Sequence, residues 1–164
     1  MSLEMLFKYN WMVREEWYRW CEEVEEAELL KERTGGMGGI LHTLFHNADV
    51  EWSWIRILQG KPDFMEKFES YNSLERVREL DASFRLEVQQ FVEKWDNDME
   101  NKLLHLPEED GSVTVLTWGE VMRHIIAHEI HHIGQLSVWS RELGRKPVSA
   151  NLIWKGLGSH HSKK

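Results

Sequence analysis

The segment Thr117–Arg145, TWGEVMRHIIAHEIHHIGQLSVWSRELGR, contains four of the nine histidines of this 164-residue chain. Wound as an α-helix at about 100° per residue, it carries one narrow line of side chains with apolar residues beside it. The line consists of Thr117, Val121, His124, His128, His132, Gln135 and Trp139. Such a face points into a core, where imidazoles are costly unless they have partners. His128 and His132 leave the same face one turn apart, so the segment predicts a helix that offers two nitrogens to one metal ion.

The composition predicts one globular domain over residues 1–164, with a polar tail from about 155 to 164. The net charge of −8 and the lack of a Lys/Arg run argue against a nucleic-acid partner. No apolar run approaches the roughly 20 residues of a membrane span, and no signal peptide opens the chain. Cys21 is the single cysteine. We therefore expect a cytoplasmic protein with no disulfide and no membrane partner.

Hydrophobic periodicity predicts an all-α four-helix bundle. The expected helices cover about residues 3–27, 38–59, 73–100 and 117–144. Pro62 stops the second helix, and about a dozen residues then lead to the third. That connection is long for adjacent antiparallel helices. We expect a long crossover that makes the second and third helices parallel.

Two turn-forming stretches separate the helices. The glycine cluster 34–39 lacks the Gly-Lys-Ser/Thr ending of a phosphate loop, so it is interpreted as a flexible turn. Asp110-Gly111 before a β-prone run predicts a small hairpin. Thr117 then caps the last helix, and Glu120 completes a capping box.

A polar stripe runs along one side of the second helix, beside its core face. It consists of His42, His46, Asp49 and Ser53. Helix bundles build metal sites from facing helices, so mid-helix His46 is the expected partner of His128 and His132, with His42 as its competitor one turn away. Three neutral imidazoles suit zinc, nickel or another late first-row ion and leave positions open. Glu51 points elsewhere and is expected to be solvated or structural, and the third helix shows no chemistry.

Two other interpretations of the histidine pair stay open at this point. The histidines can be satisfied polar groups of the core. Alternatively, His128-Glu129-Ile130-His131-His132 matches the H-E-x-x-H pattern of zinc hydrolases, with Glu129 as general base. The third ligand of such a hydrolase should follow along the chain, but Glu142 is too near on the same helix.

The sequence resembles the DinB-like/YfiT-like metal-binding proteins of bacteria over about residues 3 to 155. The matching residues are Tyr9-Asn10-Trp11, Leu44-Phe45-His46-Asn47-Ala48 and the run from His124 to Leu136. The resemblance implies a four-helix bundle with a parallel pair, a metal triad of His46, His128 and His132, and often a homodimer. Ile133 departs from the family, which commonly has Arg after the histidine pair.

What the resemblance implies about activity is a metal-dependent enzyme of the thiol-S-transferase type, in detoxification or stress response. Its partners would be a low-molecular-weight thiol and a small electrophile, and its metal zinc or nickel. An open metal site lowers the pKa of a bound thiol and holds the thiolate as a nucleophile. The alternative is a non-catalytic metal-binding or assembly module.

Three features of the first helix and the tail add expectations. Tyr9, Trp11 and Tyr18 fall off the main apolar stripe, and exposed patches of that kind mark interfaces, which also favours a homodimer. Asn10, within the buried face, is a candidate hydrogen-bond partner for a metal ligand. His160 and His161, in the polar tail, are not expected in the site.

Overall fold

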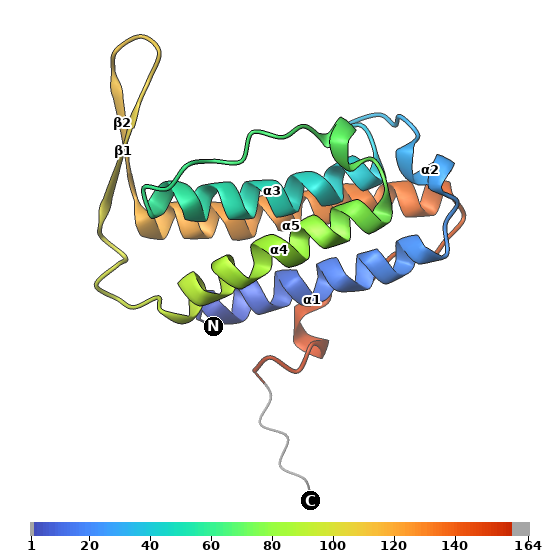
Figure 1. Cartoon of the computed structure of the whole chain (residues 1–164). Coiled ribbons are helices and arrows are strands. Elements are labelled where there is room, and N and C mark those ends of the chain that lie inside the picture. Colours follow the sequence, from blue (N-terminus) through green and yellow to red (C-terminus); the bar gives the residue numbers. More distant parts are fainter. Residues whose placement is uncertain (1, 159–164) are drawn as a thin grey trace, which may run out of the picture.

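The computed structural model describes residues 2–158 and confirms an all-α bundle (Figure 1). His160, His161 and the rest of the tail from 159 lie outside the described residues. The bundle helices are α1 (Leu3–Glu22), α3 (Ile40–Leu58), α4 (Leu74–Glu93) and α5 (Trp118–Glu142). The smaller elements are helix α2 (Glu26–Leu30), strands β1 (Leu103–Pro107) and β2 (Val113–Thr117), and 3-10 turns at Phe68–Tyr71 and Leu152–Trp154.

Two helices end earlier than the periodicity predicts. α1 stops at Glu22, and the acidic run that follows begins the separate helix α2. Carboxylates are unfavourable at a helix C-terminus and favourable in a first turn, so the break places Glu26 and Glu28 where the helix dipole stabilises them. α4 ends at Glu93, and just beyond it the Asp96 side chain accepts from backbone N–H groups that a longer helix would need.

The segment between α3 and α4, residues 59–73, runs back along the bundle before α4 begins (Figure 1). As a result, α3 and α4 lie side by side and point the same way, whereas α1 and α5 point the opposite way (Figure 1). α3 packs on both α4 and α5. This arrangement brings the middle of α3 against the middle of α5.

The β1–β2 hairpin projects from one end of the bundle, as predicted (Figure 1). Its strands pair antiparallel, with Leu103 opposite Thr117. The predicted capping box is also present, because the Thr117 side chain accepts from the Glu120 backbone N–H and the Glu120 side chain accepts from the Thr117 backbone N–H. The hairpin therefore leads directly into a fixed first turn of α5.

Tyr9 and Tyr18 are buried, so the expectation of an exposed aromatic patch is wrong for these two residues; Trp11 is half-buried. The chain after α5 folds back over the bundle, where the Tyr9 hydroxyl donates to the Ala150 carbonyl at 2.7 Å. Apolar side chains of that segment, such as Leu152, pack against the core. α1 therefore buries more than one face. None of the helices within residues 2–158 is long and apolar enough to cross a bilayer.

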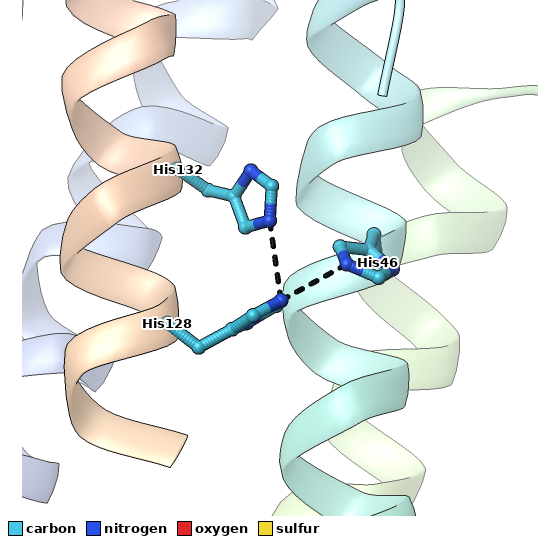
Figure 2. Close-up of side chains that lie close together, drawn as sticks. All are labelled: His46, His128 and His132. Carbon is cyan, nitrogen blue, oxygen red and sulfur yellow. Dashed lines mark hydrogen bonds between the residues drawn. The ribbon is translucent and has the colours of Figure 1, made fainter. Parts of the chain in front are cut away.

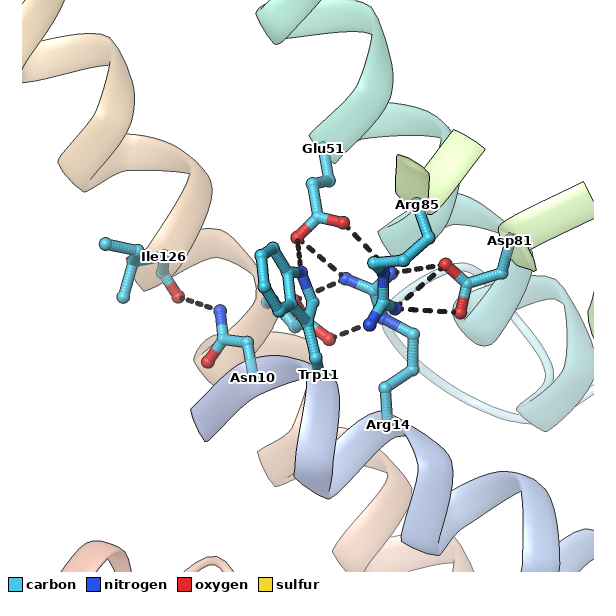
Figure 3. A network of polar contacts seen from close by, with 8 residues as sticks. Asn10, Trp11, Arg14, Glu51, Asp81, Arg85 and Ile126 are labelled. Carbon is cyan, nitrogen blue, oxygen red and sulfur yellow. Dashed lines mark hydrogen bonds and ion pairs between the residues drawn. The ribbon is translucent and has the colours of Figure 1, made fainter. Parts of the chain in front are cut away.

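A buried ion network joins the four bundle helices at their centre (Figure 3). Arg14 of α1, fully buried, contacts Glu51 of α3, Asp81 of α4 and Glu129 of α5. Arg85 also binds Asp81. Glu51 is therefore structural and not solvated. The third predicted helix, in which no chemistry was expected, contributes Asp81 to this ion network.

The electrostatics of this network depend on Arg14. Burial alone would lower the pKa of Arg14, but the three surrounding carboxylates hold it well above its usual value. Burial would raise the pKa of Asp81, yet the Arg14 and Arg85 guanidinium groups hold it low. Burial raises the pKa of Glu129 in spite of Arg14. Each carboxylate needs the guanidinium, because an unpaired buried charge is strongly unfavourable.

Candidate metal centre

Side chains of α5 point in three directions: into the apolar core, toward Arg14, and toward α3. Ile125 and Leu136 are buried in the core. Glu129 faces Arg14. His128 and His132, four residues apart, project side by side toward α3 (Figure 2). The predicted pairing of these two side chains on one face is confirmed.

His46 is the third member of the cluster, and it comes from the middle of α3 (Figure 2). Its Nε2 lies 3.0 Å from the Nε2 of His128, and the Nε2 of His128 lies 3.2 Å from the Nε2 of His132. One ligand atom from each of the three residues lies within 4.8 Å of the others. The structure therefore brings together the three histidines expected from the sequence.

The two nitrogen separations at His128 are close to those expected around a shared metal ion. Zn–N bonds are about 2.0–2.1 Å long, so two imidazole nitrogens on one tetrahedral ion stand about 3.3 Å apart. The two separations at the His128 nitrogen are 3.0 and 3.2 Å. His46 and His128 are half-buried and His132 is buried, so the cluster sits at the edge of the core.

His46 and His128 are also in the protonation state that metal binding requires. Burial and the neighbouring histidines, His132 foremost, lower the pKa of both His46 and His128 to about 4. Both rings are therefore neutral near pH 7, and a neutral ring has a nitrogen lone pair to donate.

Gln135 orients His132 from the side away from the cluster. The Nδ1–H of His132 donates to the Gln135 side-chain oxygen at 2.7 Å, which leaves the Nε2 lone pair directed at the cluster. The Gln135 amide in turn donates to His131 at 3.1 Å. Sequence reasoning placed Gln135 on the histidine line but gave it no role.

Gly36 holds the glycine turn against Gln135. A β-carbon at this position would lie 2.2 Å from the Gln135 side-chain oxygen, and the backbone φ of 51° is itself unfavourable for other residues. The turn 34–39 therefore packs closely against Gln135 beside the histidine cluster and is more than a flexible connection.

The other candidate residues lie outside the cluster. His42 stacks on Phe68, with ring centroids 4.3 Å apart. His131 is exposed and accepts from Gln135. Asn10 donates to the backbone carbonyl of Ile126 at 3.3 Å and not to one of the three clustered histidines. The hydrogen bond to a candidate metal ligand that was expected of Asn10 is made by Gln135.

Glu129 cannot serve as the general base of an H-E-x-x-H hydrolase in this arrangement. Its two carboxylate oxygens accept from Arg14 at 2.7 and 2.6 Å, and its side chain is buried in the ion network. The third histidine comes from α3, earlier in the chain, and not from a later segment. The match to the zinc-hydrolase pattern is therefore a coincidence of spacing.

The fold and the cluster together define a four-helix-bundle protein with a three-histidine candidate metal centre. The chain belongs to the DinB family, whose model matches residues 1–158. It is 47% identical over 156 residues to the uncharacterized protein YizA of Bacillus subtilis (strain 168), covering 95% of this chain and 97% of YizA. It is 20% identical over 145 residues to the protein DinB of the same bacterium, covering 85% and 84% of the two chains. Ile133, the position at which the resemblance leads us to expect an Arg, is buried in the core.

Proposed function

We propose that this protein binds a divalent transition metal, zinc or nickel, through His46, His128 and His132, and acts as a metal-dependent enzyme of the thiol-S-transferase type. The observation that carries the proposal is the convergence of three imidazoles from two helices, with one ligand atom of each within 4.8 Å of the others and the pKa of His46 and His128 lowered to about 4. Late first-row ions prefer such nitrogen ligands.

The number of protein ligands favours an enzyme over a purely structural site. The candidate group found within residues 2–158 contains three histidines, whereas structural zinc sites usually contain four protein ligands. His46 and His128 are only half-buried, so a small molecule can approach the cluster. Three ligands and partial exposure together leave a coordination position for a substrate.

A bound metal would act as a Lewis acid that lowers the pKa of a thiol. In the transfer, the thiol would release its proton to solvent, its sulfur would form a bond to the electrophilic carbon, and the bond from that carbon to the leaving group would break, with the leaving group taking the electron pair. The chain's own part is to hold the sulfur in place: the three histidines fix the position, and Gln135 keeps the His132 ring oriented. A low-molecular-weight thiol and a small electrophile are the substrates of this proposal.

The proposed biological setting rests on the family resemblance and on a single, buried cysteine. It comprises a role in detoxification or stress response, a cytoplasmic location and a homodimeric assembly. A non-catalytic metal-binding or assembly module is the competing proposal. It is favoured only if the protein holds metal tightly and turns over no thiol.

Elemental analysis of protein purified without an affinity tag tests the first half of this proposal. We expect close to one zinc or nickel ion per chain in the wild type and none in His128→Ala. Conjugation of a thiol to monochlorobimane, followed by fluorescence with and without metal, tests the second half. Metal binding without metal-dependent conjugation of any of several thiols would favour the binding module.

A further inference from the structure

A cavity of about 250 Å³ lies one helical turn from the histidine cluster. Its walls come from three elements: α3, β2 and the first turns of α5. The lining residues are Trp54, Leu116, Glu120, Val121 and His124. His124 connects the cavity to the cluster, because its ring centroid lies 5.8 Å from that of His128.

The walls of this cavity are mainly apolar. Trp54 and Leu116 are half-buried and Val121 is buried. The Trp54 ring meets the His124 ring edge-on, with centroids 5.7 Å apart. An apolar cavity of about 150 Å³ is large enough to bind benzene. The cavity here has room for one aromatic ring with a short substituent.

The polar groups of the lining argue for an uncharged occupant. The Glu120 carboxylate already accepts from the backbone N–H of Thr117 at 2.8 Å and from its hydroxyl at 2.9 Å. The lining contains no Lys or Arg, so a carboxylate or phosphate would find no cation there and would lie close to Glu120. Within residues 2–158, the His124 and Trp54 rings are engaged in no hydrogen bond, so they remain free to contact a ligand.

We propose that this cavity binds the uncharged aromatic or branched aliphatic end of a small thiol whose sulfur reaches the position between His46, His128 and His132. This inference rests on the proposed metal function and adds the substrate class. A ring with a one- or two-atom arm spans the single helical turn, about 5.4 Å, that separates the cavity from the cluster. The hairpin then has a role in the site, since Leu116 of β2 supplies one wall.

Two fluorine-labelled probes separate the cavity from the metal. Para-fluorotoluene has no metal-binding group and reports on the cavity alone, while para-fluorobenzyl mercaptan adds a thiol. Fluorine NMR of both is recorded with the full chain, metal-free and zinc-loaded. We expect para-fluorotoluene to bind with and without zinc, and the mercaptan to bind at least about tenfold more tightly with zinc, equivalent to about 1.4 kcal/mol.

Substitutions on two faces of β2 provide a matched pair. Leu116 faces the cavity, whereas its neighbour Val115 is 48% exposed and does not line it, since successive residues of a strand face opposite sides. Leu116→Trp should fill the cavity and weaken both probes about tenfold, while Val115→Trp should change neither. Trp54→Leu, which removes a wall, provides a second test if Leu116→Trp does not fold.

The outcomes distinguish this inference from the proposed function. If para-fluorotoluene does not bind the wild type, or binds the folded Leu116→Trp and Trp54→Leu variants as well as the wild type, the cavity is no binding site. If the mercaptan binds equally with and without zinc, the cavity is not part of the metal centre, and the inference is overturned. Failure to load zinc at all would instead overturn the proposed function, and the para-fluorotoluene result would still decide whether the cavity binds a ring.

Discussion

Arg14 of α1 holds both carboxylate oxygens of Glu129, at 2.7 and 2.6 Å, although Glu129 directly follows His128 in α5. Two neighbouring residues of one helix therefore face different sites, about 100° apart around its axis: His128 belongs to the candidate metal centre and Glu129 to the buried ion network. The network fixes the rotation of α5 about its axis. That rotation in turn sets the direction in which His128 and His132 point.

Alanine at each of the three clustered histidines should abolish tight metal binding. We expect His46→Ala, His128→Ala and His132→Ala to retain less than about a tenth of the wild-type metal content, since each loses one of three ligands. His42→Ala and His131→Ala are matched controls and should keep the metal, because these rings lie outside the cluster. Inductively coupled plasma mass spectrometry measures the content. Full occupancy in His46→Ala would transfer the ligand role to another residue.

Gln135→Leu should weaken metal binding by about tenfold to a hundredfold without removing a ligand. The substitution leaves the His132 Nδ1–H without its acceptor, so the ring is no longer held in one tautomer and orientation. Gln135→Glu, which keeps an acceptor oxygen, should stay near the wild type. Competition with a chromophoric chelator measures the affinity, and Gln89→Leu on the exposed side of α4 is the control. Equal affinity in Gln135→Leu would mean that the hydrogen bond does not contribute.

Arg14→Met should lower the free energy of unfolding by about 3–5 kcal/mol, because the buried carboxylates of Glu51 and Glu129 lose their guanidinium and Asp81 keeps only that of Arg85. Urea denaturation followed by circular dichroism measures the change. Adding Glu129→Gln to this variant should restore part of the loss, since it removes one of the unpaired charges. Arg19→Met, at a position with a largely exposed side chain, should stay within about 0.5 kcal/mol of the wild type.

Asp49 should contribute stability in mild acid that is lost above neutrality, opposite in sign to the contribution of His46 and His128, whose lowered pKa values favour the folded state at higher pH. Burial raises the pKa of Asp49 to about 6, despite a hydrogen bond from Ser53, so the folded state binds a proton that the unfolded state releases. The stabilisation is complete below the unfolded pKa near 4 and is lost as pH rises through about 6. We expect Asp49→Asn to remove this pH dependence and to stabilise the protein by about 1 kcal/mol at about pH 7.5, a value discounted for partial solvent exposure.

Urea titrations at about pH 5 and about pH 7.5 measure this effect. Asp98→Asn, at an exposed position between α4 and the hairpin, is the control and should leave the pH dependence unchanged. If Asp49→Asn retains the full difference between the two pH values, another group is responsible for it.

Removing the metal should lower the melting temperature. A ligand that binds only the folded state stabilises it by RT ln(1 + [L]/Kd), which is about 2.7 kcal/mol at a hundredfold excess over Kd. For a chain of this size that corresponds to about 5–10 °C. Differential scanning calorimetry with and without a chelator measures the shift. His46→Ala should show no shift, and a shift as large as that of the wild type would place the stabilising metal elsewhere.

The local parts of the site could be read from the sequence. The spacing of His128 and His132 places them on one helix face whatever surrounds them, and the capping box at Thr117 and Glu120 depends only on neighbouring residues. His46 followed from the bundle, because a mid-helix histidine on α3 meets the middle of α5.

The non-local parts could not be derived in the same way. Arg14 is a charged residue within the apolar stripe of its helix, and a single helix does not identify its partners, which are 37, 67 and 115 residues away in the sequence. Tyr9 looked exposed because a single helix gives no indication of the segment that returns over it after α5, whereas the Tyr18 ring lies against Arg78 of α4. The Gly36–Gln135 contact likewise joins residues that no periodicity relates.

The central guanidinium has a consequence for how a metal ion would enter this protein. Because Arg14 joins the four helices through carboxylates and not through the histidines, folding itself would bring the histidines together. A metal ion that binds there would have little of the chain left to order, which favours tight binding. Such an ion could be exchanged without unfolding the chain, so its identity would follow the supply of ions around the protein more than the history of its synthesis.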